Sequence, residues 1–200
     1  MNALLAALRA RRSIRRYTEQ PIPEATLDRL LDAARWAPSA HNRQPWRLAV
    51  LRGAEPKARL AACMGERLRA DRLADGDPAA VVERDLARSR TRISAAPVVV
   101  VLCLTLAEMD AYPDQRRRQA EYLMAVQSVA LAAQNLLLAA HAEGLGACWL
   151  CAPLFCPEAV RAALDLPDDW EPQALITLGY PAEAGKPPVR KPLAEVSLYR

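Results

Sequence analysis

The order of hydrophobic and polar positions predicts a chain that mixes helices and strands. Leu4, Leu5 and Leu8 share one face of a short helix over residues 2–10. The same spacing predicts helices over residues 24–37, 55–73, 79–95, 116–143 and 157–164. Extended apolar runs predict strands over residues 46–51, 98–104, 147–151 and 174–178. We therefore expect one domain over residues 1–200, with a proline-interrupted tail from residue 182 that runs along a surface.

Two of these elements form the predicted core. Residues 98–104 read Val-Val-Val-Val-Leu-Cys-Leu, which is typical of a strand buried on both faces. Residues 122–142 lack Asp, Glu, Lys and Arg and are long enough to cross a bilayer. Gln127, Gln134 and His141 nevertheless recur every seven residues as a weakly polar stripe. We expect a buried central helix, no membrane span, and close packing of its alanines in a dimer core.

Composition narrows the class of protein. A net charge of +4, from 27 basic and 23 acidic residues, gives a mixed surface rather than the basic face of a nucleic-acid-binding protein. The apolar run at the N-terminus is too short for a secretory signal and has no basic residues before it. Five cysteines without regular spacing indicate reduced thiols. We expect a cytoplasmic protein with a small-molecule ligand and no nucleic-acid partner.

Residues 37–47, Ala-Pro-Ser-Ala-His-Asn-Arg-Gln-Pro-Trp-Arg, form the first candidate binding segment, here called the polar loop. A helical pattern stops at Pro38 and an apolar run begins at Trp46, so this segment joins a helix to a strand. Ser39, Asn42 and Gln44 offer hydroxyl and amide groups that suit a polar planar ligand. An ordinary polar turn is the alternative interpretation.

Residues 11–16, Arg-Arg-Ser-Ile-Arg-Arg, form the second candidate, here called the arginine segment. Four guanidinium groups lie within six residues, and their forks match the oxygens of a phosphate. The hydroxyl of Ser13 adds a further donor. The segment therefore predicts an anion site, with a solvated basic surface as the alternative.

Metal ligands are poorly represented in the sequence. Cys148 and Cys151 have a spacing found in redox and metal sites, with Cys156 nearby. The two histidines, His41 and His141, lie far upstream, and the sequence has no second cysteine pair of this kind. We expect buried thiols on a strand and no metal site.

Three segments together resemble the FMN-dependent nitroreductase family. They are residues 11–15, residues 37–46, and Val-Arg-Lys-Pro-Leu at residues 189–193, in the same order along the chain. The resemblance implies an α+β fold with a central mixed β-sheet flanked by helices, in an intertwined homodimer with FMN at the interface. It also implies that the flavin N5 carries the hydride, so that the protein mainly supplies placement.

The resemblance assigns roles to individual residues. Arg190 helps the arginine segment to hold the phosphate and ribityl end of FMN, and the polar loop reaches the flavin from the partner subunit. His41 either donates a proton to the substrate or is structural. The segment around residues 152–153 lies over the isoalloxazine ring. The implied FMN contacts are Arg11, Arg12, Ser13, Arg15, Ser39, Asn42, Gln44, Ala152, Pro153 and Arg190.

A narrower resemblance concerns the substrate. Five segments are similar to the C-terminal reductase domain of the two-domain protein that completes the deazaflavin coenzyme F-420: residues 112–121, 134–137, 144–149, 154–157 and 166–172. This implies reduction of the enolpyruvyl double bond of a dehydro precursor, with Arg43, Arg47 and residues 116–118 available to an anionic substrate. The alternatives are a general nitro- or quinone-reducing enzyme with NAD(P)H as candidate electron donor, and a non-catalytic flavin- or nucleic-acid-binding module.

Overall fold

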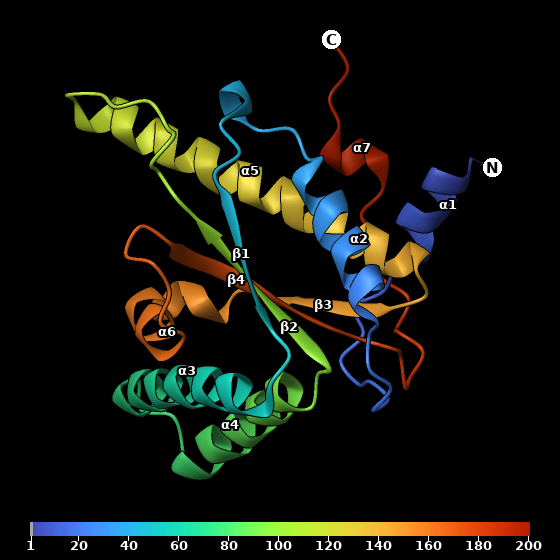
Figure 1. Cartoon of the computed structure of the whole chain (residues 1–200), viewed down its shortest axis with the longest axis vertical. Helices are drawn as coiled ribbons and strands as arrows, with labels where there is room; N and C mark the ends of the chain where they lie inside the picture. The colour runs from blue at the N-terminus through green and yellow to red at the C-terminus, as the bar shows by residue number, and fades with distance from the viewer. Residues whose placement is uncertain (1) are drawn as a thin grey trace.

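The fold is built on one four-stranded sheet, in a computed structural model that describes residues 2–200 (Figure 1). The strands are β1 (Trp46–Leu51), β2 (Val98–Leu104), β3 (Gly146–Leu150) and β4 (Glu171–Gly179), in the order β1-β2-β4-β3. Neighbouring strands all pair antiparallel, which corrects the expected mixed sheet. Within the described residues 2–200, parallel pairing is limited to an isolated bridge between Ser13 and Ala147.

The connection between β1 and β2 explains this pairing. Two helices, α3 (Ala54–Ala74) and α4 (Ala79–Ser94), follow β1 as a hairpin and pack on each other. A pair of antiparallel helices returns the chain to the end of the sheet that it left. The next strand therefore runs back beside β1, with Val99 opposite Leu51.

Four of the remaining helices lie close to their predicted positions: α1 (Ala3–Ala10), α2 (Glu24–Arg35), α5 (Gln115–Ala142) and α6 (Pro157–Ala163). The sequence did not predict the short helix α7 (Leu193–Val196) in the tail or the 3-10 turns η1 (Ala40–Asn42) and η2 (Ala152–Phe155). The last strand begins at Glu171 rather than at residue 174, since both of its ends extend the ladder with β2 and β3.

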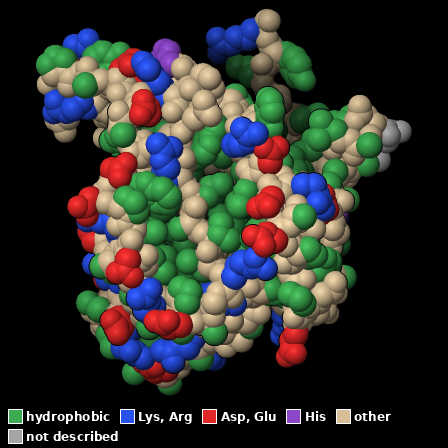
Figure 2. Space-filling model, in the orientation of Figure 1, with side chains coloured by type: hydrophobic (Ala, Val, Ile, Leu, Met, Phe, Trp, Pro, Cys, Tyr) green, Lys and Arg blue, Asp and Glu red, His purple; other side chains and the backbone are tan. Residues whose placement is uncertain are grey.

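Helices cover both faces of the sheet (Figure 1). Val98, Val100 and Leu102 pack in the core with α2 and α5, whereas Val99 and Val101 pack in a second core with α3 and α6. All seven residues of β2 are buried, which confirms the predicted central strand. Figure 2 shows hydrophobic side chains in the middle of one face and many charged side chains over the region of α3 and α4.

The long helix α5 is buried along only part of its circumference. It is long and apolar enough to cross a membrane, and 44% of its apolar window is buried inside the structure. Ala125, Ala132 and Leu136 are fully buried against the sheet, which confirms a central core helix. Leu123 and Leu131, on another side, are 50% and 45% exposed. The helix therefore presents a second apolar strip to the outside.

Candidate functional site

The arginine segment lies along the end of β3. The amide of Ile14 donates to the carbonyl oxygen of Ala147 at 3.0 Å, next to the bridge that pairs Ser13 with Ala147. Gly146 allows this close approach, because a Cβ atom there would lie 2.7 Å from Ile14 Cβ. The sheet thus fixes the backbone of the arginine segment, and the side chains of Arg11 and Arg12 line an adjacent cavity.

Three guanidinium groups gather near the buried thiol of Cys148 on β3. Burial raises the pKa of this thiol, and the positive charges of Arg15, Arg92 and Arg11 oppose the rise. Arg11 and Arg15 were predicted from the sequence. Arg92 was missed, because it comes from α4 and no local pattern distinguishes it from the other arginines of that helix. This concentration of positive charge suits a phosphate.

The two other arginines predicted at this site are placed differently. Nη1 of Arg12 donates to the carbonyl oxygens of Arg9, Ala10 and Arg11 at 2.6, 2.9 and 2.9 Å, so its guanidinium group caps the end of α1. Arg190 lies in the exposed tail, where it donates to the neighbouring carbonyl of Val189 at 3.3 Å. No hydrogen bond or ion pair among residues 2–200 joins Arg190 to the arginine segment of its own chain.

The polar loop has a defined, strained backbone. Ser39 Oγ accepts a hydrogen bond from the amide of Gln44 at 3.0 Å, and the amide of Ala40 donates to Ser128 Oγ on α5 at 3.3 Å. His41, Asn42 and Gln44 have φ values of 49°, 54° and 50°, in the left-handed region. Such residues persist only where the surrounding structure holds them, and they concentrate at functional sites. The side chains of Asn42 and Gln44 are exposed and free to meet a ligand from outside the chain.

The polar loop and the arginine segment lie at opposite corners of the sheet. The loop leads into Trp46 on the edge strand β1, and the strand register places Trp46 in line with Glu171 of β4. Ser13 pairs with Ala147 on the other edge strand, β3, and Ala147 lies opposite Leu178 of β4. Three strand spacings separate the edges by about 14 Å, and seven residues along β4 add about 24 Å. Measured across the sheet, the two segments of one chain therefore lie roughly 28 Å apart.

The turn η2 carries the residues predicted to lie over the flavin ring. Pro153 is buried, and Ala152 lines a cavity of about 230 Å³ together with Phe155 and with Arg67 and Asp71 of α3. This cavity lies on the same face of the sheet as Cys148, because Leu150, Ala152 and Cys156 belong to the core formed with α3 and α6. The turn therefore continues from the C-terminal end of β3 toward α3, whereas the arginine segment lies at the N-terminal end of the same strand.

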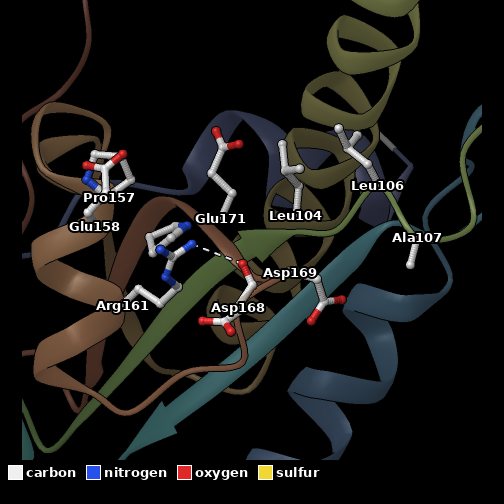
Figure 3. Close-up of a pocket in the computed structure, with 10 residues that line it drawn as sticks. Leu104, Leu106, Ala107, Pro157, Glu158, Arg161, Asp168, Asp169 and Glu171 are labelled. Carbon is white, nitrogen blue, oxygen red and sulfur yellow. Dashed lines mark hydrogen bonds between the residues drawn. The ribbon is translucent and has the colours of Figure 1, made fainter.

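A second cavity, of about 500 Å³, lies where β2 ends and β4 begins (Figure 3). Glu158, Asp168, Asp169 and Glu171 line it, against the single basic group of Arg161, which donates to the carbonyl of Asp168 at 3.0 Å. An excess of carboxylates repels anionic ligands. This cavity therefore does not suit a polyanion.

Most of the arginines considered for an anionic substrate are engaged elsewhere. Arg43 is paired with Asp110 at 2.5 Å, and Arg117 with Asp114 at the same distance. Arg118 donates to the carbonyl oxygen of Pro113 at 2.6 Å. Arg47 donates to the main-chain oxygens of its own segment. These guanidinium groups are thus already engaged by carboxylates or by main-chain carbonyl oxygens, which leaves them fewer donors for an anionic substrate.

Among residues 2–200, the structure assembles one group of metal-ligand type that the sequence did not predict. The ligand atoms of His41, Asp110 and Glu121 all lie within 4.8 Å of one another. They come from η1, from the loop after β2 and from α5, so no local spacing reveals them. The five cysteines are free thiols, and Cys151 is exposed while Cys148 is buried.

Comparison with known proteins identifies the family. The model of the nitroreductase family matches residues 8–180. The chain is 35% identical to an NADH dehydrogenase of Thermus thermophilus, covering 100% of this chain and 97% of that one. It is 33% identical to the 5,6-dimethylbenzimidazole synthase of Rhodospirillum rubrum, covering 91% and 83%. A nitroreductase-like protein from Desulfovibrio desulfuricans, solved in complex with FMN, superposes with a TM-score of 0.77 at 30% identity and 100% and 98% coverage. The chain belongs to the nitroreductase family.

Proposed function

We propose that this protein is an FMN-dependent oxidoreductase that takes electrons from NAD(P)H and passes them to a small conjugated acceptor. The observation that carries the proposal is the match of residues 8–180 to the nitroreductase family, in a chain whose arginine segment, with Arg11 and Arg15, is held against β3. This donor set fits the phosphate of FMN, and a relative of similar fold is known as an FMN complex. FMN, when bound, supplies the two-electron chemistry.

We infer that a homodimer completes the site. The polar loop lies too far from its own arginine segment to share a flavin with it, so the loop of a second copy supplies Ser39, Asn42 and Gln44. The strip of α5 with Leu123 and Leu131 offers an apolar surface for that copy. It adjoins a hollow of about 220 Å³ between α5 and the polar loop.

The exposed tail supports the same arrangement. Leu193, Val196, Leu198 and Tyr199 are 74%, 61%, 75% and 87% exposed, so they bury little surface within their own chain. Four large apolar side chains in so short a segment favour a covering partner. Arg190 precedes them and would then reach the phosphate held by the other subunit.

Each part of the chain has a limited task. The arginines neutralise the phosphate, β3 and η2 lie along the flavin, and the amides of Asn42 and Gln44 orient the ring through hydrogen bonds. His41 directly precedes Asn42 in the polar loop, where its backbone conformation sets the position of these amides. The free thiols accord with a reducing compartment, and we place the protein in the cytoplasm.

The acceptor we favour is a nitroaromatic or quinone. The carboxylate-lined cavity and the engaged arginines do not favour a substrate with several negative charges. One observation favours the dehydro precursor of the deazaflavin coenzyme as a second candidate. Two of the segments similar to that family meet in space, since the hydroxyl of Tyr122, next to residues 112–121, donates to Glu171 at 2.5 Å.

An anaerobic visible spectrum tests these proposals. The purified protein, reconstituted with FMN, is reduced with NADH or NADPH and then mixed with a nitroaromatic, a quinone or the dehydro precursor. Rapid return of the oxidised flavin band with the first two identifies the general reductase. Reoxidation by the precursor alone, with a gain of two hydrogens in its mass spectrum, identifies the biosynthetic enzyme. Failure to retain FMN would refute both.

A further inference from the structure

A buried carboxylate on α5 lacks an adequate partner. Glu121 is 5% exposed, on a helix whose other buried residues are Ala, Val, Leu and Ser. Its Oε2 accepts a hydrogen bond from the amide of Asp110 at a long 3.4 Å. No Arg, Lys or His nitrogen among residues 2–200 forms an ion pair with it. Burial of a carboxylate without a positive partner is strongly unfavourable.

Two further ligand groups point to the same place. The ligand atoms of His41 and Asp110 lie within 4.8 Å of each other and of the Glu121 carboxylate. Glu121 is buried, Asp110 half-buried and His41 exposed, so the cluster runs from the interior to the solvent. Arg43 holds Oδ1 of Asp110 at 2.5 Å and leaves Oδ2 free.

We propose that His41, Asp110 and Glu121 bind a divalent first-row cation, of which Mn²⁺ is the best match. Two carboxylates and one imidazole suit such a cation, and three protein ligands leave positions for water on the open side. Adjacent ligands of one cation, with bonds of about 2.1 Å, lie about 3.0–3.4 Å apart in octahedral or tetrahedral geometry. The three ligand atoms, which lie within 4.8 Å of one another, therefore close on the cation by side-chain rotation.

The cation has a structural consequence for the polar loop. It compensates the charge of Glu121, and it ties η1 to α5 about two helical turns from the hydrogen bond between Ala40 and Ser128. His41 immediately precedes Asn42, so a bound cation also fixes the backbone that presents the amides of Asn42 and Gln44. Cation binding itself does not depend on the flavin chemistry.

The two histidines of the chain make the test specific. Imidazole resonances of the FMN-loaded protein are recorded by ¹H–¹⁵N NMR during titration with Mn²⁺, which is paramagnetic and broadens signals close to it. His41 should broaden at substoichiometric Mn²⁺. His141, which lines a separate cavity beside Arg11 and Gly144, should stay sharp. An imidazole signal of His41 that stays sharp at one equivalent of Mn²⁺ would overturn the proposal, whether or not Mn²⁺ bound at the flavin phosphate broadens His141.

Variants locate the remaining ligands. Electron paramagnetic resonance measures the free Mn²⁺ in a titration, and the bound ion is obtained by difference. The wild-type chain should bind about one Mn²⁺ tightly. Glu121→Gln and Asp110→Asn should each raise the Kd for Mn²⁺ at least tenfold. Glu171→Gln is the control. The carboxylate of Glu171 accepts a hydrogen bond from Tyr122 near the same end of α5 but is not a proposed ligand, so this variant should retain the ion. Should Glu121→Gln fold poorly, His41→Gln on the exposed side gives the same readout. Unchanged retention in all three ligand variants would mean that the cluster is only a hydrogen-bonded network.

Discussion

The phenolic oxygen of Tyr17 lies 2.7 Å from Oγ1 of Thr177 on β4. Tyr17 also donates to the carbonyl oxygen of Ile14 at 2.6 Å, so one hydroxyl joins the arginine segment to the sheet. Burial raises the pKa of Tyr17 well above its ordinary value, which keeps the hydroxyl protonated at any physiological pH. Thr177 is 2% exposed, and its hydroxyl has no access to bulk water as a substitute partner.

Replacement of Tyr17 by Phe should therefore destabilise the protein. The change leaves Thr177 Oγ1 and the carbonyl of Ile14 without this partner, at a cost of about 1–3 kcal/mol in the free energy of unfolding. Urea denaturation monitored by circular dichroism measures the loss. Tyr199→Phe, at an 87% exposed position, is the control and should be neutral. Equal stability of the two variants would show that the Tyr17 hydroxyl does not anchor the segment.

Gly146→Ala should displace the arginine segment. The added methyl group would lie 2.7 Å from Cβ and from Cγ2 of Ile14, closer than carbon atoms pack, so one of the two segments must move. We expect a loss of about 1–3 kcal/mol in stability together with weaker FMN binding. Gly65→Ala is the matched control, because its new Cβ atom meets Leu86 at an ordinary 3.7 Å. A Gly146→Ala protein with normal stability and FMN content would contradict the close packing.

Arg11→Ala and Arg15→Ala should each weaken FMN binding. Each change removes a charged donor to the phosphate, worth about 1.5–3 kcal/mol, or roughly 10- to 150-fold in Kd. Arg92→Ala should act in the same direction if its guanidinium group contacts the phosphate. Fluorescence titration of apoprotein with FMN measures the affinities. Arg84→Ala, on the exposed surface of the same helix as Arg92, should leave the affinity unchanged. Stoichiometric FMN in all three site variants would place the phosphate elsewhere.

Mixed dimers can show that two chains form one site. A chain with Arg11→Ala and Arg15→Ala is inactive as a homodimer, and so is a chain with Asn42→Ala and Gln44→Ala. When the two chains are refolded together, a mixed dimer has one site with both segments intact and should regain up to half of the activity of one wild-type dimer. If both segments of a site came from one chain, every site in the mixed dimer would carry a defect and no activity would return.

Lys57 gives the stability of the protein a defined pH dependence. Its side chain is 7% exposed and Nζ donates to the carbonyl oxygen of Ala96 at 2.7 Å, but burial lowers its pKa below the ordinary value. The buried ammonium group thus opposes folding at neutral pH. As the pH rises through the lowered pKa toward about 10.4, the value for an unfolded chain, the folded state loses this proton first and gains stability. The stability of wild type relative to Lys57→Met should therefore rise with pH in this range, as urea titrations would show. A flat difference would mean that the folded and unfolded pKa values coincide.

Local patterns in the sequence determined the secondary structure of this protein, the burial of its central strand and the position of its main cluster of positive charge. The apolar spacing predicted the helices and strands, because side-chain periodicity is a property of neighbouring residues. The β-branched run at residues 98–104 predicted a strand buried on both faces, and this is what β2 is. The density of charge in residues 11–16 predicted an anion site, and Arg11 and Arg15 do lie together near Cys148.

Only the tertiary structure decided how these parts are combined. The antiparallel order of the sheet follows from the paired helices α3 and α4, which return the chain to the end it left. The positive charge of Arg92 acts on Cys148 of β3, and Glu121 lies near His41, across long stretches of chain. No local pattern encodes such contacts, because they depend on which faces of distant elements pack together. The same packing places the two candidate binding segments at opposite corners of the sheet, a separation that neither segment's sequence encodes.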